Sequence, residues 1–139
     1  MTEKELQEKI MTYRILESRL DSLLKQRDLV ASKLIEMQTT LASIDEIHKS
    51  ASEILFPIGS EAYASGEVVD KDKIIVEIGA NIALEKSVED GKEILNKRGK
   101  TLEESLNEIQ REISNLSAAI NQLGPEIQEL TQELQSQAG

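Results

Sequence analysis

Two stretches with a seven-residue repeat of apolar side chains flank a short segment that follows a different period. The first stretch runs from Leu6 to Leu55. The second is densest from Leu102 to Leu134 and can be followed back to Leu84. A heptad repeat keeps one apolar stripe facing a partner helix along a supercoil. Two such stretches in one chain therefore predict that the chain folds back on itself as a coiled coil.

The first repeat is apolar at most of its seam positions. Position a falls on Leu6, Tyr13, Leu20, Arg27, Leu34, Leu41, His48 and Leu55, and position d falls on Lys9, Leu16, Leu23, Val30, Met37, Ile44 and Ala51. We expect the polar seam residues Arg27 and His48 to reach past the seam to water or to a nearby carboxylate. A single histidine without a second ligand is poor evidence for a metal site.

The second repeat is regular in its distal part and contains three glycines and a proline. Its seam residues follow 4-3 spacing: Leu102, Leu106, Ile109, Ile113, Leu116, Ile120, Leu123, Ile127, Leu130 and Leu134. Gly91 and Gly99 are poor helix formers, so we expect local flexibility there. Pro125, after Gly124, removes a backbone hydrogen bond and predicts a kink or break near 124–125, followed by one more helical stretch.

The segment 56–83 between the repeats alternates with period two, which is typical of β-strands. Polar residues 69–72 and the sequence Gly79-Ala80-Asn81 mark turns, and Phe56-Pro57 interrupts the first helix. The segment has room for about four short strands, or two hairpins. Isolated hairpins are marginally stable and their open edges invite pairing, so we expect an assembly surface and an oligomer. A linker folded into hairpins also favours an antiparallel helix pair.

Composition narrows the class of protein further. The chain of 139 residues has one Phe, two Tyr and no Cys, and its net charge is −10. No Lys or Arg follows Arg111. A composition with so few aromatic residues is typical of long helices and coiled coils rather than of a compact globule. An acidic surface disfavours nucleic acid and anionic membranes. With no signal peptide or membrane-spanning stretch in the sequence, we expect a cytoplasmic protein.

The sequence offers little catalytic chemistry. The only histidine is His48 and there is no cysteine, so no nucleophile–base pair can be assembled from these residues. Gly91-Lys92 lacks the glycine-rich loop of a phosphate-binding motif. The adjacent acids Glu89-Asp90 and Glu103-Glu104 read as solvated helix faces. We therefore expect no enzyme, no cofactor and no metal.

Three sequence segments of the insert and one of the second repeat resemble a known family. They are Phe56-Pro57-Ile58-Gly59, Ala62-Tyr63-Ala64-Ser65-Gly66, Ile74 through Lys86, and Leu123-Gly124-Pro125-Glu126. Together with the two repeats, these segments are similar to the archaeal-type α subunit of prefoldin over nearly the whole chain. Ala80-Asn81 departs slightly from the family pattern at the turn.

The resemblance implies a function and partners. It implies a heterohexamer of two α and four β prefoldin subunits, joined by hairpins into a β-barrel, with two hairpins in each α subunit. It implies ATP-independent capture of unfolded client proteins at the free coiled-coil ends and their delivery to a group II chaperonin. The client-binding candidates are Leu6, Ile10, Met11, Tyr13, Ile127, Leu130 and Leu134. The assembly candidates are Tyr63, Val68, Ile74, Val76, Ile78 and Ile82.

The predicted fold is therefore mainly α with a small β part: a long antiparallel coiled-coil hairpin with two β-hairpins at one end. We expect one prefoldin-like unit over residues 1–139, with the first helix at 1–55, the assembly region at 56–83 and the second helix at 84–139. The alternative is a structural or adaptor coiled coil whose insert forms an oligomer without binding clients.

Overall fold

The computed structural model describes residues 2–49 and 53–138. Two long helices precede and follow four short strands along the chain. The elements are, in order, α1 (Thr2–Lys49), β1 (Ile54–Gly59), β2 (Ala62–Gly66), β3 (Lys73–Gly79), β4 (Ile82–Ser87) and α2 (Val88–Ala138). The chain divides into two compact units. We call residues 1–32 with 103–139 the helix-pair unit and residues 33–102 the hairpin unit. The expected architecture of two long helices and two small hairpins is confirmed.

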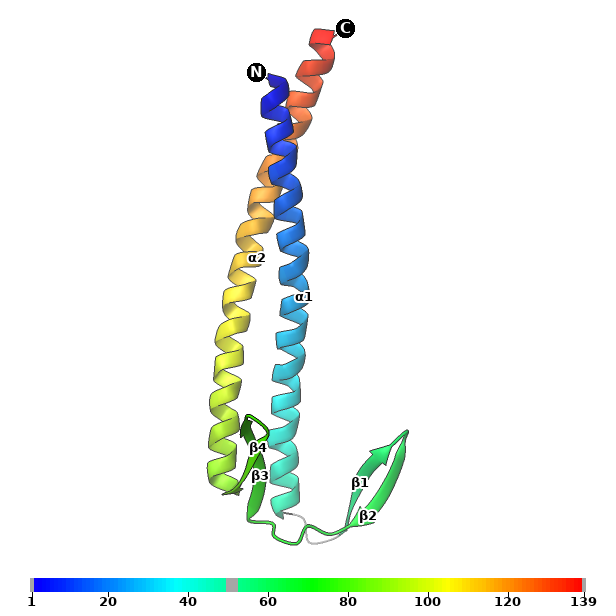
Figure 1. Ribbon diagram of the computed structural model, residues 1–139, viewed down its shortest axis with the longest axis vertical. Coiled ribbons are helices and arrows are strands. Elements are labelled where there is room, and N and C mark those ends of the chain that lie inside the picture. Colours follow the sequence, from blue (N-terminus) through cyan, green and yellow to red (C-terminus); the bar gives the residue numbers. More distant parts are fainter. Residues whose placement is uncertain (1, 50–52, 139) are drawn as a thin grey trace. The chain divides into compact units, whose positions relative to one another are not determined.

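In the helix-pair unit the two helical stretches run antiparallel. Lys9 pairs with Glu126 and Arg19 pairs with Glu112, so residue numbers rise along α1 while they fall along α2. The start of α1 and the end of α2 consequently lie at the same end of this unit (Figure 1).

The heptad positions of both stretches form the contact between these helices. The seam residues Leu6, Lys9, Tyr13, Leu16, Leu20, Arg27 and Val30 of α1 are all half-buried, as are Leu106, Ile109, Ile113, Leu116, Ile120, Leu123, Ile127, Leu130 and Leu134 of α2. Leu23 is only 1% exposed and is the one fully buried large side chain among the residues described in this unit. Two helices alone leave the flanks of their seam open to water, which explains why so little is fully buried.

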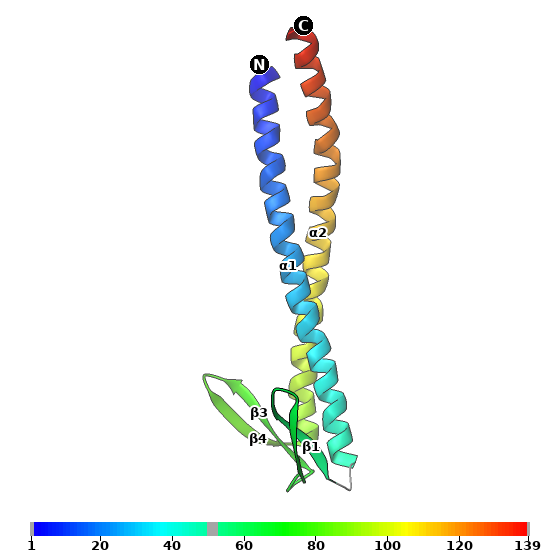
Figure 2. The ribbon, with the colours of Figure 1, turned by 90° about the vertical axis from the view of Figure 1, so that its right-hand side faces the viewer.

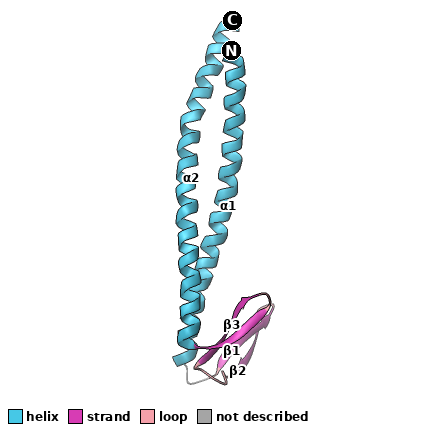
Figure 3. Cartoon of the chain, turned by 60° about the vertical axis from the view of Figure 1, so that its left-hand side comes forward, coloured by secondary structure: helices cyan, strands magenta, loops and turns pink. Residues whose placement is uncertain are grey.

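In the hairpin unit the four strands, which are magenta in Figure 3, form two separate antiparallel pairs, β1 with β2 and β3 with β4. Each hairpin turns through two residues with positive φ, Ser60-Glu61 in the first and Ala80-Asn81 in the second. Two central residues with positive φ match the right-handed twist of paired strands. The turn expected at Gly79-Ala80-Asn81 is therefore confirmed, whereas residues 69–72 lie in the connection between the two hairpins.

The start of α2 is fixed by two backbone donors that find partners. The Ser87 hydroxyl accepts a hydrogen bond from the backbone N–H of Asp90 at 3.1 Å, which is an N-cap contact. The backbone N–H of Val88 donates to the carbonyl of Asp72 at 2.9 Å. These contacts satisfy donors that the first turn of a helix leaves unpaired and hold the connection between the hairpins against α2.

The core of the hairpin unit lies where its helices meet the second hairpin. Ile44, Val88 and Leu95 form a buried cluster, and Met37, Leu41 and Ile74 pack against it. Ile74 belongs to β3, so a strand as well as the two helical stretches of the hairpin unit covers this cluster. The turn end of the β3–β4 hairpin stands away from the helices (Figure 2).

The structure corrects the helix boundaries expected from the heptads. The first helix ends at Lys49, not Leu55, because residues 54–59 pair with β2. The second begins at Val88, not residue 84, because Leu84 pairs with Val76 in the second hairpin. A single leucine at the edge of a repeat fits a strand as well as a helix, so the repeat alone does not mark these ends. The expected seam residue Ala51 lies outside the residues described.

Gly91 and Gly99, expected to loosen α2, are buried in it. A β-carbon added at Gly91 would lie 2.2 Å from Ile74 Cδ1, closer than atoms can approach. At Gly99 the corresponding neighbour, Met37 Cγ, is 3.7 Å away. The first glycine therefore admits the second hairpin against the helix, which is a packing role that sequence reasoning did not assign.

Of the kink or break expected near 124–125, the break is corrected, because α2 is helical from Val88 to Ala138 with Pro125 inside it. Proline removes a single intrahelical hydrogen bond. The seam residues Leu123 and Ile127 remain half-buried on either side of it, and their packing holds the helix together.

Candidate functional site

A groove opens between the helices of the helix-pair unit near Pro125. We call it the tip groove. Its volume is about 660 Å³, and it is lined by Ile10, Tyr13, Arg14 and Glu17 of α1 and by Ile120, Asn121, Gly124, Pro125, Ile127 and Gln128 of α2. The lining combines apolar side chains with a few polar groups. A space of this kind can accept apolar side chains of another chain.

Gly124 and Pro125 together explain why the groove is open here. Gly124 carries no side chain, and a β-carbon at this position would lie 3.9 Å from Tyr13 Cε2, within ordinary contact. The space that a larger residue would fill is left beside the Tyr13 ring. Pro125 has no N–H to donate to the carbonyl of Asn121, so that carbonyl loses its ordinary intrahelical donor.

A second, smaller hollow of about 340 Å³ adjoins the tip groove and is lined by Gln7, Ile10, Met11 and Arg14. Ile10 and Arg14 belong to both spaces. Met11 is 65% exposed. A flexible, polarizable methionine adapts to differently shaped apolar partners, so this hollow extends the apolar area around the outer side of α1.

Ion pairs hold the helices together around the groove. Lys9 Nζ lies 2.7 Å from Glu126 Oε2, and Arg19 lies 2.9 Å from Glu112 Oε1. The hydrogen bond to Glu126 raises the pKa of Lys9 above its ordinary value. Both pairs are partly exposed, so they set the register of the helices more than they add to stability.

The hairpins carry most of the exposed large apolar side chains in the parts of the chain that the structure describes. We call this set the hairpin surface, and it consists of Leu55, Phe56, Ile58 and Tyr63 on the first hairpin and Ile75, Ile78, Ile82 and Leu84 on the second. Each hairpin is a two-stranded sheet with open edges. Open edges beside exposed apolar side chains are typical of surfaces that pair with another chain.

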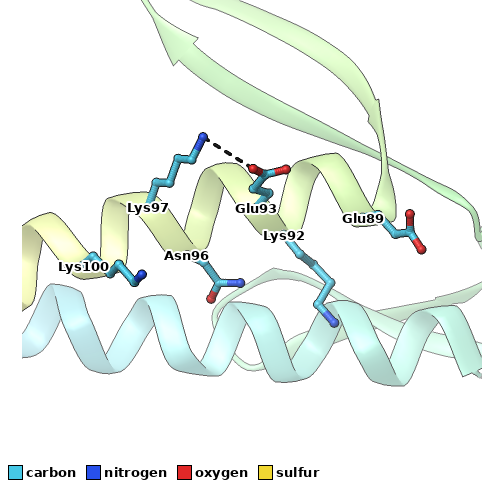
Figure 4. A pocket seen from close by; sticks show the side chains of 6 residues that line it. All are labelled: Glu89, Lys92, Glu93, Asn96, Lys97 and Lys100. Carbon is cyan, nitrogen blue, oxygen red and sulfur yellow. Dashed lines mark ion pairs between the residues drawn. The ribbon is translucent and has the colours of Figure 1, made fainter.

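A shallow hollow of about 450 Å³ lies along the first turns of α2 and is lined by Glu89, Lys92, Glu93, Asn96, Lys97 and Lys100 (Figure 4). Lys97 pairs with Glu93 at 3.5 Å, and Lys92 instead reaches Asp45 of α1 at 2.5 Å. The alternating charges match a solvated helix face. Over residues 2–49 and 53–138, no three His, Cys, Asp or Glu side chains gather as metal ligands.

Comparison with protein families shows to which family this chain belongs. The model of the prefoldin subunit family matches residues 16–133. This chain belongs to the prefoldin subunit family. It is therefore a chaperone-type subunit and not an enzyme.

Individual relatives agree with this assignment. Prefoldin subunit alpha of Pyrococcus horikoshii is 30% identical over 94% of this chain and 90% of its own length. Prefoldin subunit alpha of Methanobrevibacter smithii is 28% identical over 79% of this chain and 76% of its own length. A chain of the filamentous PFD of Methanocaldococcus jannaschii, solved by cryo-electron microscopy, superposes with a TM-score of 0.69, covering 86% of this chain and 98% of that one at 22% identity. This likeness supports the prefoldin fold.

Neither α1 nor α2, over the residues described, contains a stretch long and apolar enough to cross a membrane.

The structure divides the expected client-binding residues of this prefoldin subunit. Ile10, Tyr13 and Ile127 line the tip groove, and Met11 lines the hollow beside it. The other three, Leu6, Leu130 and Leu134, are half-buried seam residues that line neither space. The role of all seven residues in client binding stays a prediction.

Sequence reasoning missed part of the groove. It interpreted Gly124-Pro125 as a break and did not include Ile120 or Asn121 among the candidates. The signal was present, because a glycine and a proline inside an otherwise regular heptad stretch leave out a side chain and a hydrogen bond at one place. That combination indicates an opening in the helix pair as well as a break.

The expected assembly residues also divide. Tyr63, Ile78 and Ile82 are 60%, 47% and 51% exposed on the hairpins. Val76 is 5% exposed, and Ile74 packs on the core of its own hairpin unit. Val68 is half-buried in the connection between the hairpins, outside any strand. The side chains left available to a partner are thus the first three, and their part in assembly remains a prediction.

Proposed function

We propose that this chain is the α-type subunit of a prefoldin heterohexamer of two α and four β subunits. In this proposal it captures non-native proteins at its coiled-coil tip without ATP and passes them to a group II chaperonin in the cytoplasm. The tip groove is the observation that carries the proposal. It is an open space with apolar walls in a chain whose family consists of chaperone subunits.

The chemistry of the tip groove suits a client that is unfolded. Ile10, Tyr13 and Ile127 supply apolar area, and Met11 adds an adaptable side chain beside them. An unfolded chain exposes apolar side chains of many shapes, and their transfer from water into the groove is favourable at about 25 cal/mol per Å². Because Gly124 leaves the space empty, no side chain of the subunit itself has to move before a client enters.

The acidic end of the chain supports the same use. No Lys or Arg follows Arg111, so this stretch of α2 carries only negative formal charge. Like charges keep such ends apart from each other. A tip that exposes apolar side chains can then stay dispersed until a client binds.

The hairpin surface supports assembly with β subunits. Tyr63, Ile78 and Ile82 present apolar area next to unpaired strand edges. A partner strand that adds to such an edge satisfies its backbone groups and covers these side chains. Repeated around a ring of subunits, this pairing closes a β-barrel and leaves no open edge.

Suppression of aggregation tests the proposal. The complex of this chain with a β-type prefoldin subunit is mixed with a chemically denatured protein during dilution, and light scattering is followed. We expect scattering to fall as the complex is added, without ATP. Addition of a group II chaperonin with ATP should then raise the yield of refolded client above that obtained with the chaperonin alone.

Two substitutions at one position link the activity to the groove. Gly124→Phe fills the space beside Tyr13 and should weaken suppression several-fold. Gly124→Ala adds only a β-carbon, for which there is room at 3.9 Å from Tyr13 Cε2, and should leave suppression unchanged. Native mass spectrometry verifies that both variants still form the complex. A wild-type complex that assembles but never suppresses aggregation would favour a structural coiled coil without clients.

A further inference from the structure

The second hairpin is fastened to α2 at two points. At the first, Ile74 of β3 packs over Gly91, where any added β-carbon would collide with its Cδ1 and Cγ1 atoms. At the second, the guanidinium of Arg98 donates a hydrogen bond to the backbone carbonyl of Glu77, also on β3. One contact depends on the absence of a side chain and the other on a long cationic one.

The spacing of the two points matches on both elements. Ile74 and Glu77 are three strand residues apart, or roughly 10 Å. Gly91 and Arg98 are seven helix residues apart, also roughly 10 Å. Two contacts at matched spacing fix the direction of a strand along a helix, whereas one contact would leave it free to pivot.

The direction of β3 decides where the apolar half of its hairpin points. Side chains alternate along a strand, so Ile78 lies on the same face as Ile74 and Val76. The first part of that face is covered by the helices of the hairpin unit, since Val76 is buried and Ile74 packs on the core. Ile78, Ile82 and Leu84 are left exposed. The orientation of the hairpin relative to α2 therefore sets the angle at which this uncovered part would meet another subunit.

We propose that Gly91 and Arg98 are positioning residues for assembly: together they hold the β3–β4 hairpin at the angle that a partner subunit requires. This inference rests on the proposed function, in which the hairpins join the subunits. The partner is a chain that offers a strand edge and an apolar face complementary to Ile78, Ile82 and Leu84. Neither Gly91 nor Arg98 needs to touch that partner.

The test at Gly91 uses a second glycine of the same helix as its control. Gly91→Ala and Gly99→Ala bring the same gain in helix propensity. Only the first places a β-carbon against Ile74, because the β-carbon at Gly99 would be 3.7 Å from Met37 Cγ. Deuterium uptake of peptides from residues 73–87 reports the fastening of the second hairpin in the full-length chain. Peptides from residues 54–66 are the internal reference.

We expect Gly91→Ala to speed uptake in 73–87 about fivefold while leaving 54–66 unchanged. It should also weaken binding to a β-type prefoldin subunit about tenfold, measured by titration calorimetry. Gly99→Ala should change neither. Ile74→Ala removes both atoms that collide with the new β-carbon, so the double variant Gly91→Ala with Ile74→Ala should bind more tightly than Gly91→Ala alone. If Gly91→Ala acted only by lowering stability, the double variant would bind more weakly than Gly91→Ala alone.

Arg98 is tested with three substitutions. Arg98→Met keeps the aliphatic stem but removes the donor, and it should raise uptake in 73–87 and weaken binding. Arg98→Lys restores a cationic donor and should recover part of both losses. Arg111→Met removes an exposed arginine elsewhere on α2 and should have no effect.

The outcomes separate the inference from the proposed function. Unchanged uptake in both Gly91→Ala and Arg98→Met would overturn the fastening, whatever happens to binding. Faster uptake with unchanged binding would overturn the positioning role. If the wild-type chain itself fails to bind a β-type subunit, the proposed assembly fails, while the uptake measurements still decide whether the hairpin is fastened.

Discussion

The two units of this chain bury apolar side chains in different ways. Among the described residues of the helix-pair unit only Leu23 is buried, whereas the hairpin unit buries Ile44, Val76, Val88 and Leu95. The difference arises because a strand covers the helices of the hairpin unit on a third side, through Ile74. Two helices without such a cover keep their seam half-exposed. Two helices without a cover thus keep apolar side chains accessible while they stay folded. Helices covered by a hairpin bury such side chains instead and hold the hairpin in place.

The largest effect should come from removing the exposed part of the hairpin surface. A variant with Tyr63→Ser, Ile78→Ser and Ile82→Ser loses apolar area that a partner would bury, worth about 1.5 kcal/mol or more for each side chain. Binding to a β-type prefoldin subunit should weaken on the order of a thousandfold. Native mass spectrometry should show free subunits, while circular dichroism shows unchanged helix content.

The control moves the same substitution to α1. Met11→Ser, Ile15→Ser and Leu29→Ser remove three side chains that are also well exposed but lie on a helix face. This variant should assemble normally. A hairpin variant that still forms a complex of full mass would show that the strands are not the joint between subunits.

The next largest effect compares the interiors of the two units. Leu95→Ala opens a cavity in the buried cluster with Ile44 and Val88 and should lower the free energy of unfolding of the hairpin unit by about 3–4 kcal/mol. Leu116→Ala, at a half-buried seam position, should cost about half as much because the site is open to water. Hydrogen exchange of peptides from each unit measures both. Equal losses would contradict the difference in packing.

A smaller, stabilising effect is expected at Pro125. Pro125→Ala restores an N–H that can bond to the Asn121 carbonyl, and it should stabilise the helix locally by roughly 2–3 kcal/mol. Amides around residues 118–130 should exchange more slowly in this variant. If the proline serves the tip groove, the same variant should suppress aggregation less well than the wild-type complex. Faster exchange in the variant would show that the proline does not weaken the helix.

Much of this architecture follows from the sequence because its two periods are so different. A seam of Leu, Ile and Val at 4-3 spacing buries one stripe of a helix, and the alternation from Ile74 to Ile78 fits only a strand. The ends of the helices were harder to predict. Leu55 continues the heptad phase of the first repeat, and Leu84 stands where the second repeat was expected to begin, but both belong to strands. Pairing with a neighbouring strand is a tertiary effect that a local repeat does not contain.

The candidate site was predictable only in part, for the same reason. Ile10, Tyr13 and Ile127 could be chosen because they are apolar and lie where the family resemblance implies the free coiled-coil ends. Asn121 and Gly124 could not, because their contribution is a carbonyl without its donor and a missing side chain. Likewise the packing of Ile74 over Gly91 depends on how closely β3 approaches α2. That distance cannot be read from the sequence alone.

The smallest effects concern pH, and they differ in sign between the two units. In the hairpin unit, the hydrogen bond from Lys92 holds the pKa of Asp45 below its ordinary value of 3.8. A lowered folded-state pKa gives stability that is present above pH 3.8 and is lost as the pH falls through the folded value. Asp45→Asn removes this contribution. The variant should therefore lose less stability than the wild type on acidification, measured by thermal unfolding from neutral pH downward.

In the helix-pair unit the corresponding pair responds to alkali instead. The hydrogen bond to Glu126 raises the pKa of Lys9 above 10.5, so its contribution is fully present below that pH and is lost as the pH rises through the higher folded value. Lys9→Met should flatten the alkaline loss of stability and leave the acid limb unchanged, while Asp45→Asn should do the reverse. If both variants altered the same limb, the two ion pairs would not act separately, and hydrogen exchange resolved by unit would then have to show the two units unfolding together.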